Sequence, residues 1–385
     1  VKALVERTGI DPSDVDDVIF GCVDAIGGQA GNIARMSWLA AGFPEHVPGV
    51  TVDRQCGSSQ QAVHFGAQAI LSGTADLIVA GGVQNMSQIP ISAAMIVGQQ
   101  YGFDTPTSGS VGWTERYGDQ EVSQFKGAEM IAEKWDISRE ELEKWALQSH
   151  ERAKAAIAAG RFDNEIVAMG DATVDEGPRE TSLEKMATLK VLVEDGRMTA
   201  AVASQISDGA SALLLASAEA VEKYNLKPRA RIHHLSARGD DPIFMLSAPI
   251  PATKHALAKA GLSIDDIDIV DLYSCFPAAV QLGAQSLGLS LDQQLTRTGG
   301  LSFAGGPWNN YVMHSIATVV RELREQPGAK GLVWANGGFT TKHAFGVYST
   351  EPGSTPFRHA YPQAEIDAMP QRTAAAAADA AGAAT

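Results

Sequence analysis

Residues 1–22 read VKALVERTGIDPSDVDDVIFGC, and residues 253–274 repeat their pattern, 252 positions later, as TKHALAKAGLSIDDIDIVDLYS. Each stretch predicts a helix that ends at a glycine, an aspartate-rich turn, and an apolar strand that runs toward a cysteine. The aspartates are better explained by capping and turn hydrogen bonds than by a metal site. The repeat therefore predicts two similar α/β halves.

A second repeat supports the first. In each half a helix-like stretch, at 58–73 and at 311–325, precedes an apolar strand and then a pair of glycines. The strands and their glycine pairs are Asp76–Ala80 with Gly81 and Gly82, and Gly331–Ala335 with Gly337 and Gly338. Continuous apolar runs are typical of a largely buried sheet, and glycines allow backbone or ligand to approach closely.

At 385 residues the chain is long enough for two cores and an insertion. Residues 86–200 change in character, because their first third is loop-like and residues 129–160 are strongly helical. In that helical part Ser138 and Glu141 are spaced as a capping box. We expect an N-terminal half at 1–227 with a loop domain at about 86–200, a C-terminal half at 228–352, and a disordered alanine-rich tail at 353–385.

The composition argues against several kinds of partner and location. A formal net charge of −15 repels phosphates, so we expect no nucleic-acid partner. The sequence has no run of about 18 apolar residues, so no membrane insertion is expected. The three cysteines, Cys22, Cys56 and Cys275, form no CxxC pair, which favours a reducing cytoplasm and predicts neither a disulfide framework nor a zinc or other metal site.

Cys56 is the leading nucleophile candidate. Residues 52–60, VDRQCGSSQ, place it between an extended apolar run and a helix-like stretch. A helix N-terminus presents unpaired N–H groups, which can lower a thiol pKa from about 8.5 to roughly 3.5–7.5. The alternative is a buried, inert cysteine, the commoner state of a free thiol. The local context leaves both interpretations open.

These features together resemble the thiolase family. The Cys56 block, the strand into Gly81–Ser87, the Ser204–Gly209 segment and Pro249–Ala252 match it in order and spacing over roughly residues 1–350. Residues 1–270 most resemble actinobacterial degradative thiolases that act on fatty-acyl or steroid-derived CoA thioesters. The resemblance implies the thiolase fold, an α/β fold of two similar halves in a five-layered αβαβα arrangement with an inserted loop domain. It also implies a homodimer or homotetramer, with the strand Asp76–Ala80 near the two-fold axis of the dimer.

The resemblance implies a reaction as well. Such enzymes bind acyl-CoA and cleave a 3-ketoacyl-CoA with coenzyme A as co-substrate, without a covalently bound cofactor. Cys56 would be the nucleophile, and the N–H groups of Cys56 and Gly338 would hold the oxyanion. Ser204 would meet the pantetheine arm of coenzyme A, although a plain turn hydroxyl fits that position equally well.

The second half departs from the degradative pattern at its acid–base positions. Gly306 stands where the resemblance expects the histidine that deprotonates the nucleophile, and Asn336 where it expects the cysteine that protonates the enolate. Tyr273 stands at the water-holding asparagine. Glycine and an amide cannot replace general acid–base groups, which contribute about 10²–10⁴-fold each. Gly306 and Asn336 are therefore expected only to line the substrate site, with Phe276, and Gly306→His with Asn336→Cys is expected to raise turnover.

Residues 271–350 instead resemble thiolase-like proteins of the sterol-carrier-protein type. Two other side chains are candidates for the missing acid–base roles. Cys275 is a candidate proton donor and His343 a candidate base, each weighed against simple burial. His314 and His64 are better explained by packing.

Two functions remain open from the sequence. The first is a cytoplasmic thiolase-type acyltransferase in fatty-acid or steroid side-chain breakdown, with reduced activity if the replaced groups are not restored. The second is a thiolase-like protein that binds acyl-CoA or a partner protein without competent C–C cleavage.

Overall fold

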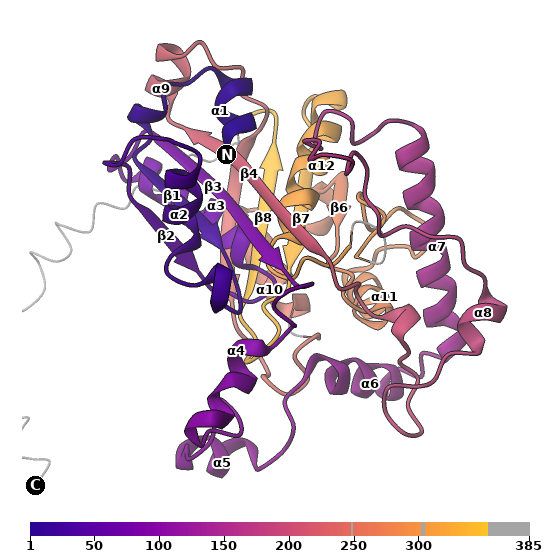
Figure 1. Cartoon of the computed structure of the whole chain (residues 1–385). Helices are drawn as coiled ribbons and strands as arrows, with labels where there is room; N and C mark the ends of the chain where they lie inside the picture. The colour runs from indigo at the N-terminus through magenta and orange to yellow at the C-terminus, as the bar shows by residue number, and fades with distance from the viewer. Residues whose placement is uncertain (248, 302–304, 353–385) are drawn as a thin grey trace, which may run out of the picture. The chain divides into compact units, whose positions relative to one another are not determined.

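The computed structural model describes residues 1–247, 249–301 and 305–352 (Figure 1). The chain from Val1 to Glu351 forms one compact unit. The tail predicted at 353–385 lies outside the described residues. The expected boundary between the two halves, at residues 227 and 228, stays a prediction.

The first sheet has four strands in the order β2-β1-β3-β4. They are β1 (Asp17–Gly21), β2 (Gly49–Val52), β3 (Leu77–Asn85) and β4 (Asp208–Ala216). β1 pairs in parallel with β2 and β3, and β4 runs antiparallel to β3. The helices that pack on this sheet are α1 (Lys2–Thr8), α2 (Ile33–Ala40), α3 (Ser58–Leu71) and α9 (Ala218–Lys223). Because helices cover it, the apolar run of β3 is buried.

The second sheet has four strands in the order β5-β8-β7-β6. They are β5 (Arg231–Arg238), β6 (Ile269–Asp271), β7 (Lys330–Ala335) and β8 (His343–Ser349). β6 and β7 are parallel, and β8 is antiparallel to both β7 and β5. The accompanying helices are α10 (Pro249–Ala260), α11 (Pro277–Leu287) and α12 (Tyr311–Glu325).

The structure confirms the internal repeat. Two 3-10 turns, η1 (Pro12–Asp14) and η5 (Ile264–Asp266), lie at the predicted offset, and the helices before them end at Gly9 and Gly261, each with φ of 69°. Asp16 accepts hydrogen bonds from the backbone N–H groups of Asp76 and Leu77, at 2.7 and 2.9 Å. Its counterpart Asp268 accepts one from Lys330 at 2.9 Å. These aspartates therefore fix the starts of β3 and β7, as their turn role predicted.

The order of the layers is decided by α3 and α12, the helices that lie between the two sheets. α3 contacts β1 and β3 on one side and β8 on the other, and α12 contacts α3, β6 and β7. α1, α2 and α9 cover the outer face of the first sheet. α10 contacts β5 and β8, and α11 packs on β7 through Gly283, which leaves no room for a side chain beside Trp334. The five-layered αβαβα prediction is confirmed.

Most of the remaining helices belong to the part of the chain that connects β3 to β4 in sequence. They are α4 (Ala93–Ile96), η3 (Val97–Tyr101), α5 (Val111–Tyr117), α6 (Gln124–Lys134), α7 (Arg139–Ala158), α8 (Leu183–Ala187) and η4 (Ala200–Val202); η2 (Gly27–Gln29) precedes α2. The first three show that this stretch is more helical than its loop-like sequence suggested. The capping box of Ser138 and Glu141 at the start of α7 is confirmed. α6 and α7 contact α11 (Figure 1), so this insertion lies against the second half.

One strand boundary differs from the prediction. Gly81 and Gly82 were expected after the first-half strand, but they lie inside β3. A Cβ added at Gly81 would collide with the carbonyl oxygen of Ser211 in β4, so glycine here permits close packing of neighbouring strands. The close approach of backbone that the glycine pair predicted is confirmed, within the strand rather than after it.

Among the described residues, no helix combines the length and the apolar character that a membrane crossing needs.

Candidate active site

Cys56 lies in the turn between β2 and α3, as the sequence predicted. Gln55, directly before it, has φ of 49°, a left-handed conformation that non-glycine residues rarely adopt. The N–H of Gly57 donates to the carbonyl of Arg54 at 3.1 Å, and that of Ser58 donates to the carbonyl of Gln55 at 3.0 Å. The turn therefore holds the sulfur beside the first turn of α3.

Burial decides the acidity of this thiol. Desolvation raises the pKa of Cys56, and hydrogen bonds from the Tyr273 side chain, the Gly338 N–H, its own N–H and the Trp308 side chain act in the opposite direction. Of the two interpretations that the sequence left open, the structure favours the buried thiol with a raised pKa, because the cost of burying a thiolate outweighs these donors. These four groups therefore lie near the one atom that would become negatively charged.

The loop after β7 supplies the Gly338 donor. The N–H of Gly337 donates to Nδ1 of His343 at 2.9 Å, and the N–H of Thr341 donates to the carbonyl of Gly338 at 2.8 Å. Thr340 and Thr341 have φ of 57° and 49°, which is strained for β-branched residues. A strained loop held by several hydrogen bonds keeps the Gly338 N–H in one place.

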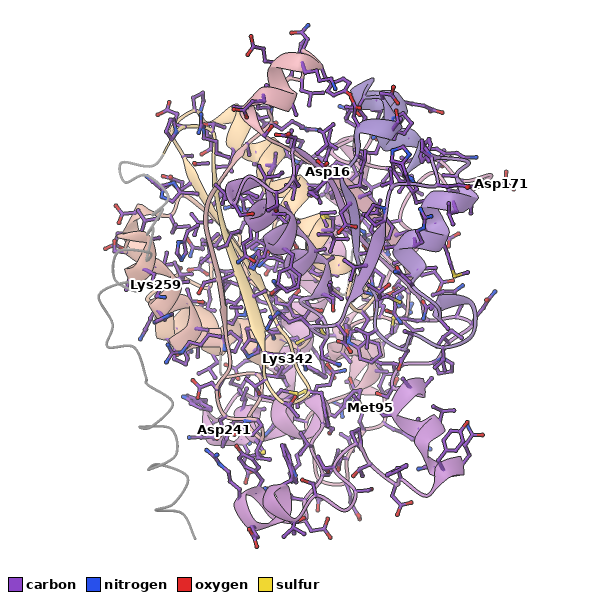
Figure 2. All side chains as sticks on the ribbon, turned by 90° about the vertical axis from the view of Figure 1, so that its left-hand side faces the viewer. Asp16, Met95, Asp171, Asp241, Lys259 and Lys342 are labelled. Carbon is purple, nitrogen blue, oxygen red and sulfur yellow. The ribbon has the colours of Figure 1, made fainter. Side chains whose placement is uncertain are left out.

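His343 faces this loop. Burial lowers its pKa to about 3, so the ring is neutral and its Nδ1 accepts from Gly337. In the described structure its hydrogen bond goes to the backbone beside Gly338 and not to Cys56. Lys342, labelled in Figure 2, directly precedes β8; its ammonium donates to the carbonyl of Phe339 at 2.6 Å and lies close enough to Cys56 for their charges to interact.

Cys275 is the second thiol at the site. It is buried, and burial and the neighbouring Cys56 both raise its pKa. Nδ2 of Asn336 donates to its sulfur at 3.6 Å, and Oδ1 of Asn336 accepts from the Trp334 indole at 2.6 Å. The indole fixes the amide orientation, so the Cys275 thiol stays protonated beside Cys56 with its sulfur held by Asn336.

The predicted substrate-site residues lie around this thiol. Ser204 donates its N–H to the carbonyl of Cys275 at 3.0 Å, and Phe276 packs edge-on against Phe125 with ring centroids 5.5 Å apart. Gly306 lies beside Ser204, since a Cβ added there would be 3.0 Å from the Ser204 Cβ. The structure therefore brings Ser204, Phe276 and Gly306 together with Cys275.

The same geometry corrects one expectation. A Cβ at Gly306 would also lie 2.5 Å from the carbonyl oxygen of Gln205, which is closer than real Cβ contacts come. Gly306→His therefore cannot restore a catalytic histidine without moving the backbone of residues 204–205.

Two other histidines have contacts that agree with packing. His314 pairs with Asn310 at 3.1 Å, and burial lowers its pKa to about 4. His64 is buried in α3, where burial lowers its pKa to about 3. Neither has an interaction with Cys56 in the described part of the chain.

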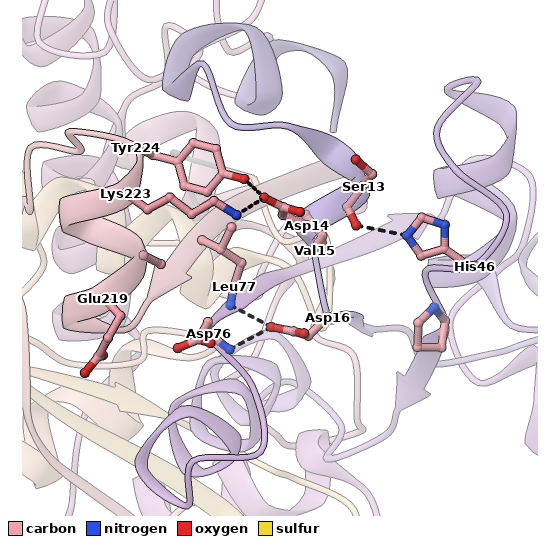
Figure 3. Close-up of a pocket in the computed structure, with 12 residues that line it drawn as sticks. Ser13, Asp14, Val15, Asp16, His46, Asp76, Leu77, Glu219, Lys223 and Tyr224 are labelled. Atoms are coloured by element: carbon pink, nitrogen blue, oxygen red, sulfur yellow. Dashed lines mark hydrogen bonds and ion pairs between the residues drawn. The ribbon is translucent and has the colours of Figure 1, made fainter.

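A surface pocket of about 450 Å³ lies at the amino ends of β1 and β3, away from Cys56 and Cys275 (Figure 3). Asp14 accepts hydrogen bonds there from Lys223 and Tyr224, while Asp16 is engaged by the start of β3. The pocket has no cysteine in its lining. Among the described residues, no group of three or more His, Cys, Asp or Glu side chains could hold a metal ion.

A buried cysteine ringed by hydrogen-bond donors, beside a second thiol and between two similar α/β halves, defines a thiolase-class acyl-transfer site. The chain belongs to the thiolase family: the thiolase N-terminal domain matches residues 1–219, and the thiolase C-terminal domain matches residues 226–347. The resemblance drawn from the sequence is confirmed. The protein is therefore a thiolase-class acyltransferase with coenzyme A as co-substrate.

Known proteins support the assignment. The chain is 62% identical over 335 residues to a steroid 3-ketoacyl-CoA thiolase, FadA6, of Mycobacterium tuberculosis, which covers 86% of this chain and 82% of that protein. It is 38% identical over 350 residues to a β-ketoadipyl-CoA thiolase of Acinetobacter baylyi, covering 86% of each. The crystal structure of human mitochondrial 3-ketoacyl-CoA thiolase matches with a TM-score of 0.78 and 34% identity, over 91% of this chain and 90% of that one.

The sequence gave no role to two residues near the Cys56 thiol. Tyr273 was noted only as a lost asparagine, and Trp308 was not named. Their positions could have indicated them, because Tyr273 stands at the expected asparagine and Trp308 lies two residues after the expected histidine, Gly306.

Proposed function

We propose that the protein is a 3-ketoacyl-CoA thiolase that degrades steroid-derived or fatty-acyl CoA thioesters through an acyl-enzyme on Cys56. The observation that carries the proposal is the convergence of two N–H groups, those of Cys56 and Gly338, on the Cys56 sulfur beside the Cys275 thiol. The substrate class is supported by the 62% identity to a steroid 3-ketoacyl-CoA thiolase.

In the first half-reaction the Cys56 thiolate bonds to the C3 carbonyl carbon, and the carbonyl electrons move to oxygen. The N–H groups of Cys56 and Gly338 hold this oxyanion, and such a donor lowers a barrier by about 2.7–4 kcal/mol in other enzymes. The C2–C3 bond then breaks, the thioester carbonyl re-forms, and the bonding pair stays on C2 of the leaving acyl-CoA as an enolate.

Cys275 supplies the proton for that enolate. Its thiol is un-ionised because burial raises its pKa, so it can give its proton to C2. In the second half-reaction the Cys275 thiolate takes the proton of the incoming coenzyme A thiol. The coenzyme A sulfur bonds to the acyl carbon and the Cys56 thiolate leaves, so protons and charge balance over the cycle.

The other predicted site residues position the reacting groups or bind the substrate. His343 fixes the loop that presents Gly338, so its role is positioning rather than proton transfer from Cys56. Asn336 orients Cys275, and Gly306 leaves room for the Ser204–Gln205 backbone. Ser204 and Phe276 line the path of the pantetheine arm and the acyl chain.

The test is acyl-enzyme detection by intact mass after mixing with a steroid-derived or a straight-chain 3-ketoacyl-CoA, with turnover followed by consumption of the 3-ketoacyl-CoA. We expect one acyl group per chain, absent in Cys56→Ser. Cys22→Ser is the matched control, because Cys22 is also buried but its thiol donates to the carbonyl of Val23. An adduct that persists in Cys56→Ser contradicts the proposal.

A second function is favoured by one specific observation, the loss of the expected histidine and cysteine at Gly306 and Asn336. A thiolase-like acyl-CoA-binding protein would bind the 3-ketoacyl-CoA in equilibrium dialysis and yield neither adduct nor product. Turnover in the assay above rejects this alternative.

We also propose a homodimer or a dimer-based tetramer that forms through β2. β3, which was expected near the two-fold axis, is paired on both edges, whereas β2 is one of the two edge strands of its sheet. Val50 on β2 is 40% exposed, and further exposed apolar side chains lie on the adjoining helices at Met36, Leu39 and Phe65. An unpaired strand edge beside apolar surface favours a second copy.

Light scattering tests this interface. Wild-type protein is expected at twice the monomer mass or more, and Val50→Lys is expected to be monomeric. Val174→Lys, at a valine that is 54% exposed elsewhere, is the control. A monomeric wild type rejects the proposal. The three free thiols fit a reducing cytoplasm, which cell fractionation would test.

A further inference from the structure

The chain before Cys275 is held along its length by a second segment, residues 295–301, which takes no part in the proposed reaction. Three backbone N–H groups join the two: that of Leu272 donates to the Leu295 carbonyl at 2.8 Å, that of Arg297 to the Asp271 carboxylate at 2.7 Å, and that of Leu301 to the Ser274 hydroxyl oxygen at 2.8 Å. We call residues 295–301 the clamp segment. It follows the chain from the end of β6 to the residue before Cys275.

The clamp segment is itself anchored to α12. The hydroxyl groups of Thr298 and Tyr311 are 2.6 Å apart, and both side chains are buried. The Arg297 guanidinium pairs with the Glu322 carboxylate, with nitrogen and oxygen 3.3 Å apart. Tyr311 and Glu322 both lie on the helix that contacts β6 and β7, so the clamp segment is fixed to the second half.

A serine from the insertion between β3 and β4 reaches the same segment. Ser149 on α7, which is buried, donates its hydroxyl hydrogen to the carbonyl of Gly299. The next residue, Gly300, has φ of 103°, and a Cβ added there would lie 2.8 Å from Oγ of Ser274 and 3.1 Å from Oγ of Ser149. The two serines therefore meet at one glycine. Through it α7, which contacts α11 of the second half (Figure 1), is connected to the residue before Cys275.

Cys275 is thereby fixed from three directions. Its sulfur accepts from the Asn336 amide at 3.6 Å, and its carbonyl accepts from the N–H of Ser204 at 3.0 Å. The clamp segment holds the preceding residue through Ser274. Only rotation about the Cα–Cβ bond moves a cysteine sulfur relative to its backbone, and that rotation has a few staggered positions. A fixed backbone therefore places the thiol.

We propose that Ser149 and Ser274 are positioning residues, which act through the clamp segment to hold the Cys275 thiol where it gives its proton to C2 of the leaving enolate. The inference rests on the proposed function, since Cys275 is the proton donor of that cycle. Proton transfer needs the donor within hydrogen-bond reach of the accepting atom, and a displacement of about 1 Å can slow a step by about 10²-fold. Loss of either hydroxyl frees one contact of the clamp segment and removes no reacting group.

The experiment follows thiolysis of a 3-ketoacyl-CoA and acyl transfer from acyl-CoA to Cys56, in the full chain. We expect Ser149→Ala and Ser274→Ala each to lower thiolytic turnover by about tenfold to 10²-fold, because the proton donor is present but misplaced. The yield of acyl-enzyme from acyl-CoA is expected to match the wild type, since that transfer needs no proton on carbon. Wild-type thiolysis in both variants, or an equal loss of both reactions, overturns the proposal.

A second background separates positioning from general support of the fold. In Cys275→Ala, thiolysis has already lost the group that the serines hold. Adding Ser149→Ala or Ser274→Ala is therefore expected to cause no further loss. A further loss as large as in the wild-type background would show that the serines act on something other than the Cys275 thiol, and it overturns the proposal.

Ser217→Ala is the matched control. Ser217 is also buried, and its hydroxyl oxygen accepts from a backbone N–H, that of Ala220 at 3.0 Å, at the start of α9 on the first sheet. The variant loses a comparable hydrogen bond away from Cys275 and is expected to keep wild-type thiolysis. A loss equal to that of Ser149→Ala contradicts a positioning role.

The outcome is separable from the proposed function. If Cys275→Ala keeps wild-type thiolysis, the assigned proton donor is wrong and this inference falls with it. If Cys275→Ala loses thiolysis while Ser149→Ala and Ser274→Ala keep it, the proposed function stands and this inference alone fails. If one serine variant melts at a much lower temperature in circular dichroism, the other decides, because Ser149 and Ser274 lie on separate segments.

Discussion

Replacement of Cys275 by alanine should separate the two kinds of chemistry at this site. The thiol is 3% exposed and accepts one hydrogen bond, from Asn336 at 3.6 Å. Its loss leaves one buried amide donor without a partner, which lowers the free energy of unfolding by about 1–3 kcal/mol. The larger effect is on cleavage, because a missing general acid slows a step by about 10²–10⁴-fold, or roughly 2.7–5.4 kcal/mol of barrier.

The assay compares two reactions of the same variant. Thiolysis of a 3-ketoacyl-CoA needs a proton on carbon, whereas transfer of an acyl group from acyl-CoA to Cys56 does not. Thiolytic turnover is therefore expected to fall by about 10²–10⁴-fold, while the yield of acyl-enzyme from acyl-CoA falls much less. Cys22→Ala, at a buried thiol that donates to the carbonyl of Val23, is expected to change neither.

Two results would refute this reasoning. Wild-type thiolysis in Cys275→Ala would show that another group protonates the enolate. An equal loss of thiolysis and of acyl-enzyme would show that Cys275 supports the structure of the nucleophile rather than the cleavage step.

Gly306→His should lower expression and melting temperature rather than raise turnover, because its Cβ would lie 2.5 Å from the Gln205 carbonyl; gain of thiolysis would contradict the packing argument. His343→Leu should slow acyl-enzyme formation and destabilise the fold by about 1–3 kcal/mol through the unpaired Gly337 N–H, with partial rescue by His343→Gln. Stability should fall as pH drops below about 6.5, since unfolding lets the buried histidines take up protons that the folded state refuses. Their pKa values are lowered to about 3, 4 and 3 at His64, His314 and His343. The carboxyls of half-buried Asp175 and buried Asp271, with pKa raised to about 6, act in the opposite sense below pH 6 but are fewer; urea titrations at pH 7 and 5 with equal midpoints would exclude this balance.

The sequence by itself determined the features that depend on neighbouring residues. The 252-residue repeat predicted η1 and η5 at matching positions, because glycine caps, aspartate turns and apolar runs act locally. The Ser138 capping box and the place of Cys56 before α3 were likewise readable, since each needs only a few consecutive residues. The family motifs then extended this to the whole fold.

Local patterns failed where packing between distant segments decides. Gly81 and Gly82 were expected after the strand but lie within β3, because only the partner strand β4 shows why a side chain is excluded at Gly81. Gly306 looked like a simple loss of a histidine, yet the Ser204–Gln205 backbone occupies the space that a side chain would need.

Only the tertiary structure decided the chemistry around the nucleophile. Tyr273, Trp308 and Gly338 lie more than two hundred positions from Cys56 in the chain, yet all three lie close enough to lower the pKa of its thiol against the effect of burial. The helix N-terminus visible in the sequence favours a low thiol pKa, whereas burial between the two halves raises it. Desolvation depends on everything that surrounds an atom. The neighbours of Cys56 in sequence could therefore indicate it as the candidate nucleophile, but they could not predict the pKa of its thiol.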